Sequence, residues 1–161
     1  MQINESIQIV QATENHINLL APLYHHYRSG FHQDTNVNDV KNFLTKTIDL
    51  PNTAVVIAVK NVSAKKQIAL GFINMFCFYS TISFKKMWII NDIFVEETQR
   101  QQGIGKVLIR AAKDFALADG ATHLLLETTP DNKAALALYA SEGYVKDETG
   151  IRLYLELKPA K

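Results

Sequence analysis

A turn that contains two glycines has the composition of an anion-binding site: Arg100-Gln101-Gln102-Gly103-Ile104-Gly105-Lys106. Glycine adopts backbone angles that other residues avoid, and it lets a ligand approach the main chain closely. A helix that begins here directs unpaired N–H groups and the positive end of its dipole outward. Such a helix start can bind phosphate or pyrophosphate. A glycine-rich turn between a strand and a helix, with no ligand, is the alternative interpretation.

The turn differs from the two common nucleotide-binding motifs. It is not a P-loop, because Val107 follows Lys106 and the first glycine of that motif is missing. It is not Gly-x-Gly-x-x-Gly, because Leu108 stands in place of the third glycine. By itself, therefore, the turn does not distinguish a ligand site from a plain turn.

A second pair of residues with chemical potential lies downstream. Asn132 and Tyr139 are seven residues apart in a predicted helix, which is nearly two turns, so they share a face. A tyrosine hydroxyl in that position can donate a proton or a hydrogen bond. The alternative is that Tyr139 is a core aromatic residue and Asn132 only begins the helix.

Periodicity predicts the elements that position these residues. One helix starts near Glu14, and further helices are predicted over 38–47, 103–119 and 132–141. A polar loop is predicted over 61–67, between two strands. The predicted strands cover 7–12, 53–59, 68–79, 87–95, 124–126, 144–146 and 151–157. This order predicts a mixed α/β sheet with helices packed on it. With no internal repeat or linker, residues 1–161 are expected to form a single domain.

Composition narrows the functional class. A formal net charge of +1 on 161 residues offers no electrostatic case for binding nucleic acid. No apolar stretch approaches the roughly 20 residues of a membrane span, and the N-terminus does not resemble a secretory signal. Cys77 is the only cysteine, which favours a reduced, cytoplasmic setting. The histidines His25, His26 and His32 have no metal-site spacing, so no metal is expected.

Two segments together resemble a known family. They are Arg100-x-x-Gly103-x-Gly105 and, after a strand, Asn132-x-x-Ala135-x-x-Leu138-Tyr139-x-x-x-Gly143-Tyr144. In order and separation they resemble the signature segments of the GNAT superfamily of N-acetyltransferases. The resemblance implies an α/β (α+β) fold with a mostly antiparallel seven-stranded sheet, a central splay and about four helices. It also implies direct transfer of an acetyl group from acetyl-coenzyme A to a primary amine.

The resemblance implies specific roles at the cofactor. Backbone N–H groups from Gln101 to Gly105 would hold the pyrophosphate, and the strand 93–95 would pair with the pantetheine arm. Asn132 would contact the pantetheine, and Tyr139 would lie beside the thioester sulfur as general acid. The expected cofactor contacts are Ile93, Phe94, Val95, Arg100, Gln101, Gln102, Gly103, Ile104, Gly105, Lys106, Asn132 and Tyr139.

The third central strand indicates a narrower branch. Phe78-Tyr79-Ser80-Thr81, followed by the segment 88–95, resembles the diamine (polyamine) acetyltransferases. That branch has a glutamate before the aspartate, whereas this chain has Asn91 before Asp92. Asparagine cannot accept a proton as a base, so Asp92 is the catalytic candidate beside Tyr139. Asp92 could attract a cationic amine or act through water, or it could simply bond nearby backbone.

The acceptor is expected to bind under the first two helices. The candidate contacts are Tyr27, Asp34, Tyr79, Asn91 and Glu127, although Glu127 could equally cap the end of its strand. The expected acceptor is a small amine, such as a diamine, a polyamine or an amino-acid-like amine. A protein lysine or N-terminus, a catalytically silent acyl-coenzyme A-binding module, and a protein-interaction domain with an empty slot are the alternatives.

Family members are frequently homodimers, so the resemblance implies a homodimer here. The strands predicted over 72–78 and 151–157 are the candidate contact edges.

Overall fold

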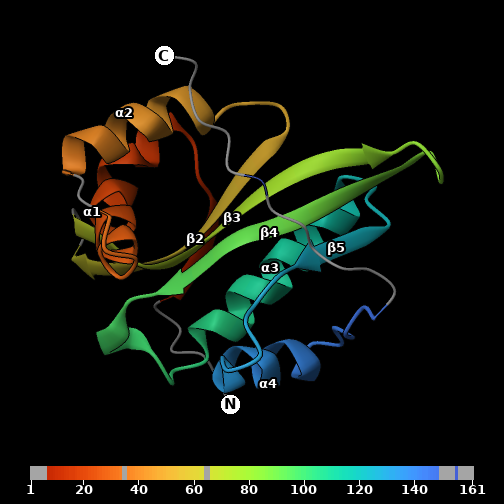
Figure 1. The fold of residues 1–161 in the computed structure, drawn as a ribbon. Helices are drawn as coiled ribbons and strands as arrows, with labels where there is room; N and C mark the ends of the chain where they lie inside the picture. The colour runs from red at the N-terminus through yellow and green to blue at the C-terminus, as the bar shows by residue number, and fades with distance from the viewer. Residues whose placement is uncertain (1–6, 34–35, 64–65, 149–154, 156–161) are drawn as a thin grey trace.

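The computed structural model describes residues 7–33, 36–63, 66–148 and 155. In these ranges five strands form one sheet in the order β1-β2-β3-β4-β5 (Figure 1). The first four strands pair antiparallel, and the fifth lies parallel to β4. The strands are β1 (Ile7–Gln11), β2 (Thr53–Ser63), β3 (Lys66–Ser80), β4 (Lys85–Val95) and β5 (His123–Leu126). The prediction of a mixed, mostly antiparallel sheet is therefore confirmed.

Helices cover both faces of the sheet. Helices α1 (Ile17–Ser29) and α2 (Val37–Thr47) pack together on one face, and α3 (Ile104–Ala118) and α4 (Lys133–Ser141) lie on the other (Figure 1). Two short 3-10 turns, η1 (Glu14–His16) and η2 (Glu97–Gln99), precede α1 and α3. The expected four helices are thus present.

Strand β2 shows how one sheet supports two cores. Its residues alternate between faces: Ala54, Val56 and Ala58 pack under α3, whereas Val55 and Ile57 pack under α1 and α2. This is the two-residue period of a strand that is covered on both sides.

The prediction of seven strands is wrong in one place. Residues 144–146 form no strand, because the Tyr144 N–H bonds the Tyr139 carbonyl at 3.1 Å and so closes the end of α4. Gly143, at φ +89°, turns the chain into this arrangement. The predicted strand 151–157 lies outside the described residues, apart from Leu155.

Two further predictions about β3 are wrong. The polar segment 61–67 is mostly strand, since Lys60 pairs with Ile68 and Asn61 with Gln67. Its polar side chains extend the hairpin because backbone pairing does not require apolar residues at an exposed end. Residues 72–78 cannot form a dimer edge, because β3 pairs with β2 on one side and β4 on the other.

Strand β4 has two irregularities that matter for the site. Asn74 pairs with Asp92 and Met75 with Ile90, so Asn91 is an extra residue in β4, a β-bulge. The pairing of β4 with β5 runs from Met87 to Ile90 only, while β4 itself continues to Val95. The expected splay between these strands therefore begins at the bulge.

Candidate active site

The turn between η2 and α3 presents backbone N–H groups at the start of a helix. Gly103 caps α3 at φ +81°, and the Val107 N–H to Gly103 carbonyl bond, at 3.1 Å, begins the helical ladder. The N–H groups of Ile104, Gly105 and Lys106 therefore precede the ladder. A Cβ atom built on Gly103 would meet no atom of the described residues within 4 Å. This open helix start fits a pyrophosphate.

The second glycine has a packing role that the sequence did not reveal. A Cβ atom on Gly105 would lie 3.3 Å from Leu138 Cδ2 and 3.9 Å from Val95 Cγ2. Gly105 therefore lets the first turn of α3 approach α4. The side chain of Ile104 is buried in the core, so this residue offers a ligand only its main chain.

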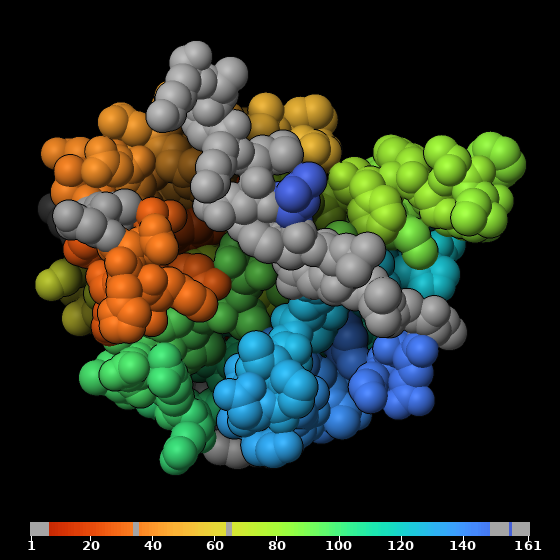
Figure 2. All heavy atoms as spheres, in the orientation of Figure 1, coloured from red at the N-terminus to blue at the C-terminus, as the bar shows by residue number. Residues whose placement is uncertain are grey.

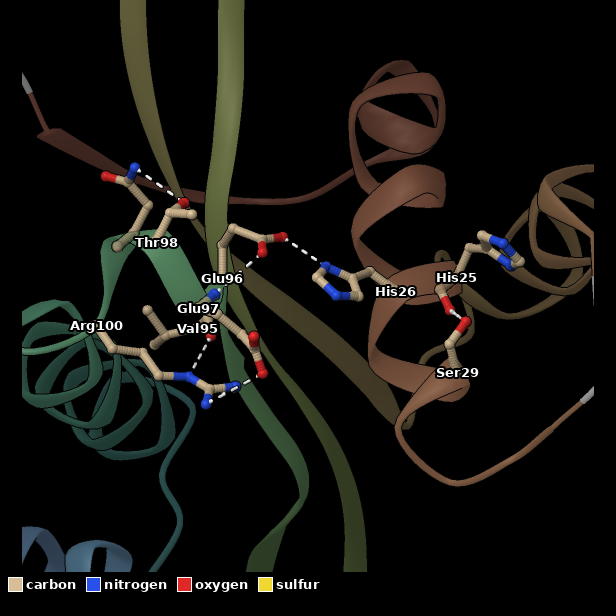
Figure 3. Close-up of polar contacts among 9 residues, drawn as sticks. His25, His26, Ser29, Val95, Glu96, Glu97, Thr98 and Arg100 are labelled. Carbon is tan, nitrogen blue, oxygen red and sulfur yellow. Dashed lines mark hydrogen bonds and ion pairs between the residues drawn. The ribbon is translucent and has the colours of Figure 1, made fainter.

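The two cations of the turn, Arg100 and Lys106, have internal partners, and Figure 3 shows those of Arg100. The Nε atom of Arg100 donates to the Val95 carbonyl at 3.1 Å, and its guanidinium lies 3.5 Å from Glu97 Oε1. The Nζ atom of Lys106 lies 3.1 Å from Glu142 Oε1. In this arrangement the backbone N–H groups, rather than these side chains, are the available phosphate ligands.

Asp92 is held by three neutral side-chain donors. The Tyr27 hydroxyl donates to its Oδ1 atom at 2.8 Å, and Asn74 and Asn91 donate to Oδ2 at 3.1 and 2.8 Å. The bulge places Asn91 beside the carboxylate that it binds. Burial, followed by the hydrogen bond to Asp92, raises the pKa of Tyr27 well above its ordinary value. Tyr27 is therefore protonated at neutral pH and orients Asp92 from α1.

A cleft of about 440 Å³ opens between α1, α2 and the strands β3 and β4. This volume lies in the range of small-molecule sites. Its walls combine two carboxylates and one arginine with aromatic rings. The lining residues are Tyr24, Tyr27, Arg28, Asp39, Val40, Phe43, Asn74, Phe76, Asn91 and Asp92.

Tyr139 lies in α4, on the opposite face of the sheet from α1 and α2, which line the cleft. Only 6% of Tyr139 is exposed, and this burial raises the pKa of its hydroxyl. The negative charge that Tyr139 would carry if deprotonated is the last of the influences that raise the pKa of Tyr27. The ring of Tyr144, centred 5.8 Å away, packs against it.

Asn132 has a structural partner at the start of α4. Its Oδ1 atom accepts a hydrogen bond from the Ala135 N–H at 3.3 Å, as an N-cap residue does. Asn132 thus lies immediately before the helix that carries Tyr139, and its side-chain oxygen is engaged in the cap.

The predicted acceptor residues divide into three groups. Tyr27 and Asn91 line the cleft. Tyr79 is 66% exposed near the end of the β3–β4 hairpin, and the Nζ atom of Lys86 lies over its ring. Glu127 is exposed directly after β5. Neither Tyr79 nor Glu127 lines the cleft. Asp34 lies outside the described residues.

Seven residues of the cleft wall were not among the predicted site residues: Tyr24, Arg28, Asp39, Val40, Phe43, Asn74 and Phe76. Asn74 carried a usable signal, because it is a polar residue inside the apolar run 72–76. Tyr24 and Phe43 fit the apolar stripes of their helices, so their spacing indicated only core packing.

Figure 2 shows that the turn after β4, drawn in green, reaches the surface between α1, in orange-red, and the light-blue segment before α4. Strand β4 therefore connects the cleft to the turn at Gly103, whose backbone N–H groups could bind a phosphate. Asn91 and Asp92 contribute to the cleft, and the chain reaches Gly103 after a further 11 residues.

The described residues contain neither a cluster that could hold a metal ion nor a helix that could span a membrane. No group of three or more His, Cys, Asp or Glu residues in this part of the chain could hold a metal ion. None of its helices is both long enough and apolar enough to cross a membrane.

Comparisons with known proteins agree with this geometry. Residues 19–144 match the model of the acetyltransferase (GNAT) family. A Bacillus subtilis (strain 168) protein described as an "uncharacterized N-acetyltransferase YhfO" is 33% identical over 155 residues, which are 96% of this chain and 100% of that protein.

Solved structures are similar over nearly the whole chain. A crystal structure described as "a probable acetyltransferase" has a TM-score of 0.83 and 29% identity, covering 95% of this chain and 99% of that one. An aminoglycoside N-acetyltransferase, AAC(6')-Iy, in complex with CoA has a TM-score of 0.76 and 18% identity, covering 94% and 95%. At that identity the second likeness concerns the fold. The chain belongs to the acetyltransferase (GNAT) family, whose members are N-acetyltransferases that use acetyl-coenzyme A.

Proposed function

We propose that the protein transfers the acetyl group of acetyl-coenzyme A directly to a primary amine of a small molecule. One observation carries the proposal: strand β4 contributes Asn91 and Asp92 to the cleft and then leads into the turn at Gly103. A donor held by the turn and an acceptor held in the cleft would meet along the same strand. Holding two reactants together in this way removes much of the entropic barrier to transfer.

The donor would be held mainly by backbone. The N–H groups of Ile104, Gly105 and Lys106 would bind the pyrophosphate, since Arg100 and Lys106 already have partners. The main chain of β4 beyond Ile90, where pairing with β5 has stopped, would pair with the pantetheine arm. When bound, acetyl-coenzyme A supplies the reactive thioester.

The acceptor amine must lose a proton before it attacks. Asp92 is the carboxylate nearest to this task, and its hydrogen bonds from Tyr27, Asn74 and Asn91 fix its orientation. It would attract the ammonium form and receive the proton directly or through a water molecule. Asn91 cannot take this role, because an amide does not accept a proton near neutral pH.

The departing sulfur must gain a proton or a hydrogen bond. Burial raises the pKa of Tyr139, so its hydroxyl carries a proton at neutral pH. Tyr139 would donate that proton as the carbon–sulfur bond breaks. Starting from the ammonium form, the nitrogen loses two protons: the first passes through Asp92 to water, and the second, lost as the amide forms, replaces the proton that Tyr139 gives to the sulfur, so the transfer releases one proton to solvent.

A small cationic amine is the acceptor class that the cleft supports best. Asp39 and Asp92 supply negative charge, and aromatic side chains supply apolar contact for a carbon skeleton. A diamine or polyamine fits these features, and AAC(6')-Iy, of similar fold, is described as acting on aminoglycosides. Acetylation of a protein lysine or N-terminus, and a silent acyl-coenzyme A-binding module, are the competing functions.

The homodimer implied by the family remains a prediction. Ile82 and Phe84, at 94% and 87% exposed, end the β3–β4 hairpin and would be covered by a second copy. Sedimentation at micromolar concentration tests it; a strictly monomeric profile would contradict it.

The decisive experiment is a thiol-release assay with acetyl-coenzyme A and a panel of amines. The panel contains putrescine, spermidine, lysine derivatives, an aminoglycoside and a basic peptide. We expect release with a small cationic amine and little with the peptide. Tight acetyl-coenzyme A binding by calorimetry without release from any amine would instead favour the silent binding module.

A further inference from the structure

The hydroxyl of Tyr24 is buried without a partner. Tyr24 lies in α1 and is only 5% exposed, and its ring stacks on Phe72 with centroids 4.0 Å apart and planes at 17°. This stacking fixes the ring against the sheet. Among the described residues, the hydroxyl oxygen has no hydrogen-bond partner.

Such a group needs an explanation, because buried polar atoms in folded proteins are nearly always paired. Burial, followed by the charge of Asp92, raises the pKa of Tyr24 far above its ordinary value. The hydroxyl therefore carries its proton and can both donate and accept a hydrogen bond.

The position of Tyr24 is at the inner end of the cleft. It lines the cleft together with Asp92, and it also lines a void of about 10 Å³ whose other walls include Thr47 and Thr53. Cleft and void share the residues Tyr24, Phe43, Asn74 and Phe76. The void lacks Asn91 and Asp92 and adds residues of α2 and β2, so it lies on the side away from β4.

We propose that the Tyr24 hydroxyl binds a second polar group of the acceptor, while the reacting amine lies at Asp92. The acceptor is then a primary amine that carries another amino or hydroxyl group, joined by a carbon skeleton that contacts Phe43 and Phe76. This inference rests on the proposed function, because it assigns the acceptor to the same cleft. It makes Tyr24 a specificity-determining residue.

The test compares putrescine with n-butylamine, which have the same four-carbon chain and differ by one amino group. Their dissociation constants are measured by calorimetry on the protein saturated with coenzyme A, so no turnover is required. We expect the wild type to bind putrescine at least tenfold more tightly, and Tyr24→Phe to reduce that preference to about twofold. An unchanged preference in Tyr24→Phe, or none in the wild type, would overturn the proposal.

Tyr144→Phe is the matched control. Its hydroxyl is also buried without a partner among the described residues, but it lies outside the cleft. We expect this variant to keep the wild-type preference between the two amines. Loss of the preference in Tyr144→Phe as well would mean that the effect is general and would overturn the assignment to Tyr24.

Thermal unfolding of the free protein gives an independent readout. Removing an unpartnered buried hydroxyl should leave the melting temperature of Tyr24→Phe equal to or above that of the wild type. A clear fall would show that the hydroxyl already has a partner, such as a water molecule, and would overturn the proposal. If thiol release fails with every amine but the binding preference behaves as expected, the proposed function fails and the assignment of Tyr24 stands.

Discussion

The Nδ1 atom of His26 on α1 lies 2.9 Å from Oε2 of Glu96, the residue that follows β4 (Figure 3). The other oxygen of the same carboxylate accepts a hydrogen bond from the Glu97 N–H at 3.0 Å and caps η2. One side chain thus connects a helix that lines the cleft with the turn that leads to Gly103. The ring of His26 also packs edge-on against Phe94, with centroids 5.7 Å apart.

Glu96→Ala should weaken coenzyme A binding about fivefold. It removes the cap of η2, and a lost helix cap costs about 1 kcal/mol. His26→Ala leaves the cap in place and removes a partly exposed polar contact, which contributes about 0–1 kcal/mol, together with the edge-on contact to Phe94, so its effect should be smaller. Calorimetry on both variants checks the order. A larger loss in His26→Ala would mean that α1, and not the cap, controls the turn.

Tyr139→Phe should lower kcat by about 100-fold or more, the usual contribution of a general acid, while the Kd of coenzyme A changes less than about twofold. Steady-state kinetics and calorimetry separate the two quantities. Equal losses of turnover and cofactor affinity would identify Tyr139 as a binding residue.

Asp92→Asn should lower kcat/KM for a cationic amine by about 100-fold at pH 7. It removes the charge and the proton acceptor and keeps one oxygen for the Tyr27 hydroxyl, while its amide nitrogen replaces the oxygen that accepts from Asn74 and Asn91, so thermal unfolding of the variant is the control for its fold. Activity should recover as the pH rises toward 10, because the amine then loses its proton without help. A pH–rate profile that runs parallel to the wild type would exclude Asp92 as the proton acceptor.

Gly103→Val should reduce coenzyme A affinity at least tenfold. A side chain at φ +81° strains the backbone by about 1–2 kcal/mol. It meets no described atom in the free protein, but it would occupy the space proposed for the pyrophosphate. Gly120→Val is the matched control, because Gly120 has φ +77° at the opposite end of α3. Both variants should lose similar stability in urea, and only Gly103→Val should lose affinity. Similar affinities in the two variants would argue against the pyrophosphate assignment.

Asp119 should make stability depend on pH. Its Oδ2 atom accepts hydrogen bonds from Lys86 Nζ at 2.7 Å and Trp88 Nε1 at 2.8 Å. The bond from Lys86, followed by that from Trp88, lowers the pKa of Asp119 below its ordinary value. A lowered pKa stabilises the fold above the unfolded-state value of about 4, and this contribution is lost as the pH falls through the folded-state value.

Asp119→Asn should therefore cost about 1 kcal/mol at pH 7, the upper range for a partly exposed ion pair, and less at pH 3. Urea unfolding at the two pH values measures the difference. A cost that is equal at both would assign the effect to packing of Trp88 rather than to the charge of Asp119.

The sequence by itself determined the order of the main elements and the two signature segments. Gly103 and Gly120 bound α3 because a positive φ favours glycine, which is a local property. Tyr139 is predictable for the same reason, since helical spacing depends only on neighbours in the chain. The family follows from these local patterns, which the match over residues 19–144 confirms.

Only the tertiary structure decided how the site is assembled. Tyr27 and Asp92 are 65 residues apart in the sequence, and they meet because α1 packs over β3 and β4. Strand register and helix packing also determine three further features of the site. These are the bulge at Asn91, the internal contacts of Arg100 and Lys106, and the hydroxyl of Tyr24, which has no partner among the described residues. A residue type shows which bonds a side chain can form, whereas its partner is set by contacts between distant segments.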